Sequence, residues 1–181
     1  MMRLSEIQFP STRRAAEKIL LQNGYEKLNF GAYSDVYEKE GSPFVLKLFS
    51  SNDKGYVMFY QWCQANAGNP HVPVFKSKII RITDNYNAIR MERLYPLNSE
   101  MRILVMYIVT YFRGLYLRYF KNRDFIEAKQ KIPEDIRNLL DNLYSYMKSH
   151  DMTSNYDIKI ENFMRRGNDL VFIDLIVDEY N

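Results

Sequence analysis

The hydrophobic pattern changes along the chain, from short apolar runs in the first half to helical spacing in the second. Before residue 95, most runs are rich in β-branched and aromatic residues and are bounded by turn sequences such as Glu40-Gly41-Ser42-Pro43, as in strands and hairpins. Two stretches have helical spacing instead, 12–22 behind a possible N-cap at Ser11 and 54–65 behind Asn52-Asp53. The predicted strands cover residues 25–30, 34–38, 44–49, 74–82 and 88–94.

From Ser99 onward the apolar residues recur at helical spacing. We predict one helix over 99–120 and another over 134–149, which begins just after Pro133. The charged stretch 121–131 between them is expected to be exposed, either as a solvated face or as a contact for an acidic partner. The pattern therefore predicts an α+β fold with an antiparallel five-stranded sheet and one main helix, followed by a mainly helical part.

Composition narrows the class of protein. With 181 residues, 46% of them hydrophobic and 15% aromatic, the chain is expected to form one globular domain. A net charge of +3 is too small to argue for nucleic acid binding. The single cysteine, Cys63, excludes an internal disulfide and a cysteine zinc site. It also makes a reducing cytoplasm the expected compartment. The apolar run 103–112 is too short to span a bilayer and is expected to be a buried helix rather than a membrane contact, and 1–10 does not resemble a signal peptide.

The stretch from Tyr156 to Asp174 carries the strongest chemical signal. Asp157, Lys159 and Asn162 stand at the spacing Asp-x-Lys-x-x-Asn, and an apolar run ends in Asp174 twelve residues later. This layout supplies a base for a hydroxyl group, a cation for a transferred phosphoryl group and two oxygen ligands for Mg²⁺. We predict two short extended segments joined by a polar turn at 165–169. The alternative is a solvated hairpin with Asp and Asn at turn positions.

Residues near the start of the chain could bind the phosphate groups that this motif would act on. Lys47 lies in the apolar run Val45-Leu46-Lys47-Leu48-Phe49, where it faces either solvent or a bound anion. The segment before it has the spacing of G-x-G-x-x-G-x-V, but only Gly31 and Val36 keep the residue types, so an ordinary hairpin bend is the alternative. Asn29 and Ser34 stand at the other two glycine positions.

Two further features qualify the prediction. The helix predicted over 54–65 contains no glutamate that could pair with Lys47, so another acid would orient this lysine or the helix would be held permanently in place. His71 has no second His or Cys near it in the sequence, and we expect it to be a surface loop residue.

Taken together, these residues resemble the eukaryotic-like protein kinase fold in a much reduced, bilobal form, over residues 25 to 178. The short serine/threonine kinases that tailed bacteriophages make early in infection are the most similar group, and minimal bacterial effector kinases are a looser likeness. The resemblance implies an N-terminal helical extension over 1–24, an N-lobe over 25–94 and a truncated C-lobe over 95–181 that contains the catalytic hairpin.

The resemblance also implies the cofactors ATP and Mg²⁺ and a transfer of the γ-phosphoryl group to Ser or Thr of host proteins in the host cytoplasm. Asp157 would orient the hydroxyl group or accept its proton, and Lys159 would neutralise charge. Asn162 and Asp174 would hold Mg²⁺. The residues implied in nucleotide binding are Gly31, Ser34, Val36, Val45, Lys47, Met91, Glu92 and Leu94, the last three at the hinge that reads the adenine edge.

Departures from the family pattern leave two other functions open. Asn155 replaces the catalytic-loop histidine, no glycine stands third in the motif that begins at Asp174, and seven residues after Asp174 leave no room for an activation segment. We therefore expect activity that is constitutive or dependent on a partner. One alternative is a pseudokinase that captures a host protein without chemistry. Another is a small-molecule phosphotransferase of the aminoglycoside type.

Overall fold

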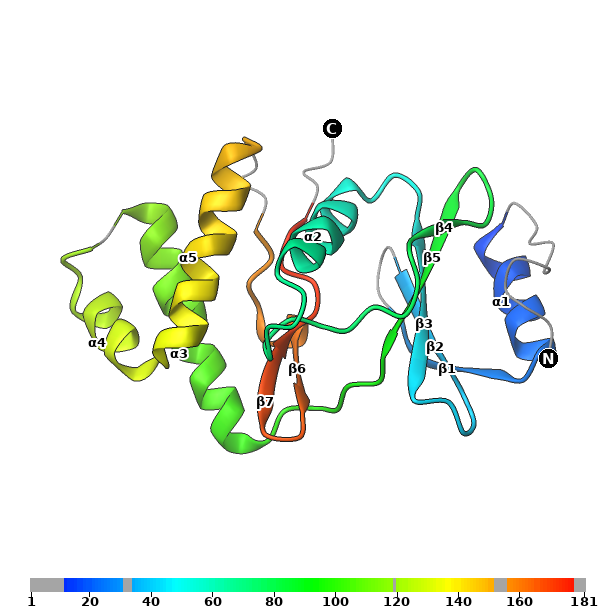
Figure 1. Ribbon diagram of the computed structural model, residues 1–181, viewed down its shortest axis with the longest axis horizontal. Coiled ribbons are helices and arrows are strands. Elements are labelled where there is room, and N and C mark those ends of the chain that lie inside the picture. Colours follow the sequence, from blue (N-terminus) through cyan, green and yellow to red (C-terminus); the bar gives the residue numbers. More distant parts are fainter. Residues whose placement is uncertain (1–11, 31–33, 119, 152–155, 178–181) are drawn as a thin grey trace. The chain divides into compact units, whose positions relative to one another are not determined.

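The protein has an α+β fold, as predicted. The computed structural model describes residues 12–30, 34–118, 120–151 and 156–177 (Figure 1). These residues form two compact units. The first contains the described residues up to Lys54 together with Val74–Arg93, and the second contains Gly55–Pro73 and the described residues from Leu94 onward. Within the described chain, no helix has both the length and the apolar character needed to cross a membrane.

The first unit is an antiparallel sheet of five strands with the order β1-β2-β3-β5-β4 (Figure 1). The first three strands and the hairpin turn follow the prediction closely, because their apolar runs and the Gly41 turn, at φ +71°, are local signals. The elements of this unit are α1 (Arg13–Gln22), β1 (Tyr25–Phe30), β2 (Ser34–Lys39), β3 (Phe44–Ser50), β4 (Ile80–Arg81) and β5 (Tyr86–Glu92).

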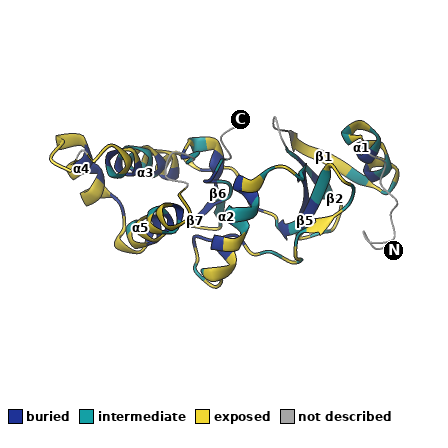
Figure 2. Ribbon diagram, turned by 90° about the horizontal axis from the view of Figure 1, so that it is seen from above, coloured by how far each residue is buried: buried dark blue, intermediate teal, exposed yellow. Residues whose placement is uncertain are grey.

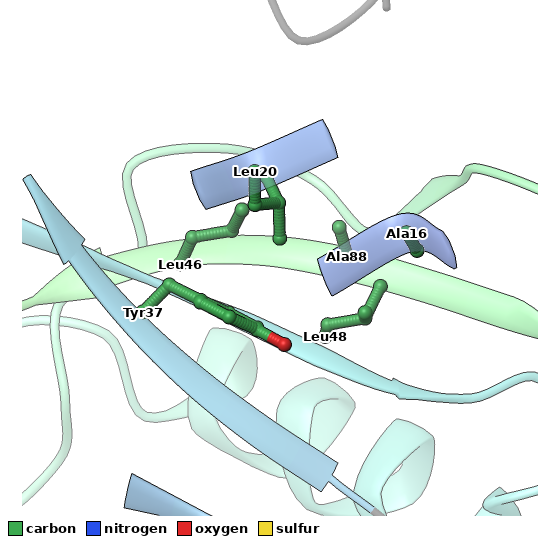
Figure 3. Close-up of a cluster of buried hydrophobic side chains, with 6 residues drawn as sticks. All are labelled: Ala16, Leu20, Tyr37, Leu46, Leu48 and Ala88. Atoms are coloured by element: carbon green, nitrogen blue, oxygen red, sulfur yellow. The ribbon is translucent and has the colours of Figure 1, made fainter. Parts of the chain in front are cut away.

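Helix α1 covers one face of this sheet. Thr12 caps it, with the side-chain oxygen 3.3 Å from the amide nitrogen of Ala15, whereas the predicted cap Ser11 lies outside the described residues. Ala16 and Leu20 lie over the sheet residues in Figure 3 and are fully buried. The apolar stripe of α1 therefore closes a small core of its own, made of Ala16, Leu20, Tyr37, Leu46, Leu48 and Ala88.

The strand predicted over 74–82 is wrong for most of its length. Only Ile80–Arg81 forms β4, and Phe75 makes one isolated bridge to Met91. Main-chain bonds to β5 do form, from the Glu92 amide to the Val74 carbonyl at 2.9 Å and from the Lys76 amide to the Arg90 carbonyl at 2.8 Å, but the chain bends at Lys76 and Ser77. The residue types predicted a strand, whereas pairing at a sheet edge depends on a partner that the local sequence does not specify.

The second unit is mainly helical and ends in a small hairpin. Helices α2 and α5 are joined by a hydrogen bond of 2.8 Å from Trp62 to Asn142, and α3 and α5 by one of 2.8 Å from Tyr111 to Asp141. Its elements are α2 (Lys54–Ala65, whose first residue belongs to the first unit), α3 (Ser99–Leu117), α4 (Arg123–Lys131), α5 (Glu134–Ser149), a short 3₁₀ turn (Ile160–Asn162), β6 (Phe163–Arg166) and β7 (Asp169–Phe172).

The charged stretch 121–131 contains a helix that the sequence analysis missed. Asn122 caps α4, and Phe125 and Ala128 are buried on its inner side, so that α4 and α5 each have one buried and one exposed side (Figure 2). Phe125 packs against Gly114 of α3 so closely that a Cβ atom at Gly114 would stand 2.2 Å from its ring. The many charges concealed this i, i+3 apolar pair. Helix α3 accordingly ends at Leu117, and Arg118 terminates it with a positive φ of 56°.

Candidate active site

Asp157, Lys159 and Asn162 form a tight polar cluster just before the hairpin. The Lys159 ammonium lies 2.7 Å from Oδ2 of Asp157, and Nδ2 of Asn162 donates to the same oxygen at 2.8 Å. Two short strands joined by a turn form as predicted, but the motif residues precede the first of them. Lys159 has extended dihedral angles, and Ile160–Asn162 then make a 3₁₀ turn, closed by the bond of 3.0 Å from the Asn162 amide to the Lys159 carbonyl. This turn brings the three side chains of the motif together.

The two donors leave the other carboxylate oxygen of Asp157 open. Both contacts go to Oδ2, and no donor in the described part of the chain reaches Oδ1. The Asp157 side chain is 31% exposed, so a molecule from solution can reach it. A carboxylate with one oxygen held and the other free is suited to accept a hydrogen bond from an incoming hydroxyl group.

Asn162 is buried, and its orientation follows from its hydrogen bonds. Its Nδ2 donates both to the main-chain carbonyl of Asp157, at 2.7 Å, and to the Asp157 carboxylate. Because both protons of the amide nitrogen are used in this way, the Oδ1 atom of Asn162 points away from Asp157 and remains available as an acceptor. An amide oxygen in a fixed orientation is a suitable ligand for a hard cation.

Main-chain hydrogen bonds hold Asp174 beside these residues. The amide of Ile173 donates to the Asn162 carbonyl at 3.0 Å, and the amide of Asp157 donates to the Leu175 carbonyl at 2.9 Å. Asp174 lies between these two bonds and is half-buried. Burial raises the pKa of the Cys63 thiol on α2, and the negative charge of Asp174 adds to this rise. The Asp174 carboxylate therefore lies near enough to α2 to act on Cys63. The structure therefore brings all four residues of the motif into one place.

The hairpin that carries Asn162 and Asp174 is anchored to the loop after α2. Arg166 on β6 donates to the carbonyls of Pro70 and Val72, each at 3.0 Å, and the Phe172 amide donates to the His71 carbonyl at 2.9 Å. The turn between the strands is shorter than predicted. It contains Gly167, with a φ of +57°, while Arg166 belongs to β6. Strand pairing thus sets where the two predicted metal ligands stand.

His71 is buried, which corrects its prediction as a surface loop residue. Its ring nitrogens lie 2.7 Å from the Leu170 carbonyl oxygen and 3.1 Å from the Asp135 carboxylate, and the ring stacks on Phe172. The hydrogen bond from His71 lowers the pKa of Asp135, although partial burial opposes it. Its partner Asp135 is 64 residues away in the sequence, so no local signal could have identified this contact.

The first unit gathers most of the predicted nucleotide-binding residues on one face of its sheet. Directly opposed residues of paired strands share a face, and the pairs Val36 with Lys47 and Val45 with Met91 lie opposite each other. This face is the one that α1 does not cover. Lys47 is only 6% exposed, so it is not a solvated surface lysine. A buried ammonium among apolar residues is costly unless an anion or several acceptors compensate it.

The predicted hinge residues include one main-chain donor, the Leu94 amide, for which the described chain supplies no main-chain acceptor. The amides of Glu92, Arg93 and Tyr95 donate to the carbonyls of Val74, Pro43 and Arg165. Within the described chain, the amide of Leu94 has no such acceptor, and its side chain is buried. Of the predicted hinge residues, Leu94 can therefore donate to a ligand edge.

Some predicted features lie outside the described residues or depart from the family pattern. Gly31 and Asn155 belong to segments that the structure does not describe. Helix α2 spans the predicted residues and, as read from the sequence, carries no acidic side chain. Lys47 belongs to the first unit and the four motif residues belong to the second, so their meeting around one nucleotide stays a prediction.

A separate groove lies between the helices of the second unit. It has a volume of about 770 Å³ and is lined by residues of α3, α4 and α5, which include Ile126, Lys129, Arg137 and Tyr144, and by Phe120 from the connection between α3 and α4. Lys129, an exposed residue of the charged stretch 121–131, contributes to this groove. None of the predicted site residues lines it.

The predicted ligands fit Mg²⁺ and ATP by their chemistry. Asn162 and Asp174 offer one amide oxygen and one carboxylate, which are the hard oxygen ligands that Mg²⁺ takes. Over the described residues, no group of three or more His, Cys, Asp and Glu is placed to hold a metal. A cation held by two protein oxygens, with water and phosphate oxygens completing its shell, is the arrangement that these residues can support.

Comparison with known proteins found similarity only among solved structures. No protein-family model and no curated protein sequence matches the chain. Among solved structures, the kinase PK-1 of Cydia pomonella granulovirus is similar at 17% identity and a TM-score of 0.43, over 91% of this chain and 58% of that one. Rad53 1–466 in complex with AMP-PNP is similar at 13% identity and a TM-score of 0.41, over 90% of this chain and 42% of that one. This chain thus spans only about half the length of these two kinases.

Aminoglycoside phosphotransferases are also similar. The ternary complex of APH(2")-IIa with streptomycin and ATP matches at 12% identity and a TM-score of 0.38, over 93% of this chain and 72% of that one. The structures similar to this chain are therefore kinase-like and include both protein kinases and small-molecule phosphotransferases.

Proposed function

We propose that this protein is a phosphotransferase that transfers the γ-phosphoryl group of ATP to a hydroxyl group. The observation that carries the proposal is the arrangement around Asp157, whose Oδ2 is held by Lys159 and Asn162 while Oδ1 faces no protein donor within the described chain. In this arrangement Oδ1 accepts the hydrogen bond of the incoming hydroxyl group and then its proton. Lys159, which is 53% exposed, offsets negative charge next to the same carboxylate.

The proposal assigns the nucleotide to residues of both units. Lys47 would contact phosphate oxygens from the sheet face that also carries Val36, Val45 and Met91. At the hinge, the carbonyl of Glu92 and the amide of Leu94 would contact the adenine edge. Asn162 and Asp174 would hold Mg²⁺, and bound Mg-ATP would supply both the transferable phosphoryl group and a positive charge beside it.

The finer proposal concerns the acceptor. The resemblance to short bacteriophage serine/threonine kinases favours Ser and Thr hydroxyl groups of host proteins, with the reaction in the host cytoplasm. A pseudokinase would have no need of a free carboxylate oxygen beside an oriented amide, so the geometry around Asp157 favours chemistry over simple capture. A small hydroxylated acceptor such as an aminoglycoside remains an outcome that the experiment must be able to detect.

The test incubates the protein with γ-labelled Mg-ATP and a bacterial lysate, and in a parallel reaction with aminoglycosides. Asp157→Asn should remove the label from the acceptor. Asp169→Asn, the same substitution at an exposed position of the same hairpin, should leave transfer unchanged. Label on lysate proteins supports the protein kinase, and label on the aminoglycoside supports the small-molecule enzyme. Equal label with wild type and Asp157→Asn, or none with either, contradicts the proposed function.

A second test addresses nucleotide binding alone. Mg-ATP should raise the melting temperature of the wild-type protein, since a ligand that binds only the folded state stabilises it. Lys47→Ala should reduce this shift. An equal shift in both proteins would mean that Lys47 does not contact the nucleotide.

A further inference from the structure

Four polar side chains are buried to 8% exposure or less among the described residues, namely Asp35, Lys47, His71 and Asn162. The proposed function uses Lys47 and Asn162, and His71 anchors the hairpin. Asp35 has no such role, yet its side chain is completely buried on β2, on the sheet face that α1 covers. A carboxylate in such a place must be compensated by donors, and those donors show what it does.

Arg13 of α1 and Asp35 form a bidentate pair. Nε of Arg13 lies 2.5 Å from Oδ2 of Asp35 and its Nη2 lies 2.7 Å from Oδ1, so the planar guanidinium contacts both oxygens. The same Nη2 donates to the main-chain carbonyl of Ser34 at 3.2 Å. Lys27 adds a third contact to Asp35, at 3.0 Å. We call Arg13, Asp35 and the Ser34 carbonyl the β2 clamp.

Electrostatics favour the charged form of the clamp. Burial by itself would raise the pKa of Asp35, but the hydrogen bonds from Arg13 and Lys27 outweigh it and keep this pKa below its usual value. The pKa of Arg13 is raised, chiefly by its hydrogen bond to Asp35. The clamp is therefore an ion pair at neutral pH and keeps a fixed geometry.

The clamp acts on residues that face the other side of the sheet. Side chains alternate along a strand, so Asp35 faces α1 while its neighbours Ser34 and Val36 face the side of Lys47. Val36 stands directly opposite Lys47 in the register of β2 and β3. A shift of Asp35 would move the main chain of Ser34 and Val36 with it, because the three residues are consecutive.

We propose that Arg13 and Asp35 are positioning residues for the triphosphate of a bound nucleotide. The β2 clamp holds the start of β2 so that Ser34 and Val36 keep their places beside Lys47, and it thereby makes α1 a working part of the nucleotide site. This inference rests on the proposed function. It adds a role for a helix that contributes none of the nucleotide-binding residues themselves.

The chain offers a matched control at the opposite end of the same strand. Lys39, the last residue of β2, donates to the carbonyl of Asn23 at the end of α1 at 2.8 Å. Loss of this contact also loosens α1 from β2, but at the end away from Ser34. A purely structural role of α1 would make the Arg13 and Lys39 contacts similar in effect, whereas a positioning role makes them different.

The experiment measures the Kd of Mg-ATP by calorimetry for wild type, Arg13→Ala, Arg13→Lys and Lys39→Ala, below the melting temperature of each. Arg13→Ala should weaken binding about tenfold, the scale expected when a contact group is displaced. Arg13→Lys keeps the charge but loses the planar group that contacts both Asp35 oxygens, so its Kd should lie between those of Arg13→Ala and wild type. Lys39→Ala should change the Kd by less than about twofold, since its contact lies outside the clamp.

Activity gives a second readout. In steady-state transfer, Arg13→Ala should raise the KM for ATP and leave kcat near the wild-type value, because Asp157 is untouched. Equal Kd values for Arg13→Ala and wild type, or equal losses in Arg13→Ala and Lys39→Ala, would overturn the inference while leaving the proposed function intact. A wild-type protein that binds no Mg-ATP would overturn both.

Discussion

Asp35 in the first unit and Asp157 in the second are both paired with cations, but their surroundings are opposite. The side chain of Asp35 is fully buried, and donors contact both of its oxygens. Asp157 is 31% exposed, and its two donors share one oxygen. A carboxylate whose oxygens are all engaged holds structure together and has no capacity left for a ligand. A carboxylate with a free, accessible oxygen contributes little to the fold and can take part in chemistry.

The two sites also differ in what holds them. The β2 clamp depends on side chains, with α1 and β2 joined by an ion pair. The cluster around Asp157 depends on the main chain, through the 3₁₀ turn and the bonds of Ile173 and Leu175. Loss of a charge should therefore unfold the first site and only inactivate the second. Substitutions at the two carboxylates and at their neighbours should separate an effect on stability from an effect on transfer.

Asp157→Asn should reduce the rate of phosphoryl transfer about 10³- to 10⁴-fold, the upper range for loss of a general base. Its urea unfolding curve should stay close to that of wild type, because the main-chain bonds of the site remain. Transfer rates and equilibrium unfolding of the same preparation would test this. A variant that keeps most of its activity would remove Asp157 from the reaction.

Asp35→Asn should chiefly lower stability, in contrast to Asp157→Asn, which should chiefly lower activity. The substitution removes a buried carboxylate that accepts charge-assisted hydrogen bonds from Arg13 and Lys27, whose side chains are each about one-third exposed, at a cost of about 1.5–3 kcal/mol. The free energy of unfolding of the first unit should fall by this order, as measured by hydrogen exchange of the β1 and β2 amides. Asp84→Asn is the matched control, because Asp84 is 94% exposed in its pair with Arg81 and should change nothing measurable. Equal stability of both variants would contradict a structural role of the clamp.

Lys159→Met should lower the transfer rate about 100-fold, because an offsetting cation beside the reacting group is lost. Stability should hardly change, since half-exposed ion pairs contribute about 0–1 kcal/mol. Initial rates and melting temperature would be measured together. A large loss of melting temperature with an unchanged rate would reverse the assignment of this ion pair.

Acid should destabilise the first unit through Asp35. Its pKa in the folded protein lies below the usual value of 3.8, so its stabilising contribution is complete above about pH 4 and is lost as the pH falls through the folded pKa. Urea unfolding between pH 5 and 2, followed in β1 and β2, should show this loss in wild type and a flatter profile in Asp35→Asn. Parallel profiles in the two proteins would mean that Asp35 is not responsible.

Tyr37→Phe should have the smallest effect, and it should be stabilising. The Tyr37 hydroxyl is buried under α1 and makes no hydrogen bond of good geometry among the described residues, although it lies near Asp35, and burial together with the charge of Asp35 raises its pKa. Removal of an unsatisfied buried hydroxyl should add up to about 1 kcal/mol to the free energy of unfolding. Thermal melts would detect this, and a loss of stability would indicate a partner for the hydroxyl.

Patterns within short stretches of sequence predicted much of the fold and the part of the site that contains Asp157, Lys159 and Asn162. The bounds of β1, α2 and α5 follow from apolar spacing and turn residues within a few positions of each other. Asp157, Lys159 and Asn162 stand within six residues, so their spacing alone indicated a common site. The β-branched and aromatic residues of 74–82 could not show how much of this stretch would pair, and the charges of 121–131 concealed α4.

The α+β class, the order of the described helices and strands up to residue 65 and the Asp-Lys-Asn motif could be predicted from the amino-acid sequence, because each depends on interactions between near neighbours. Three features became visible only in the folded protein: Asp35 is buried under Arg13, His71 lies between Leu170 and Asp135, and Asp174 stands beside Asn162. These contacts join residues from 12 to 99 positions apart. Burial and charge compensation at such distances depend on how whole elements pack, which no local pattern records.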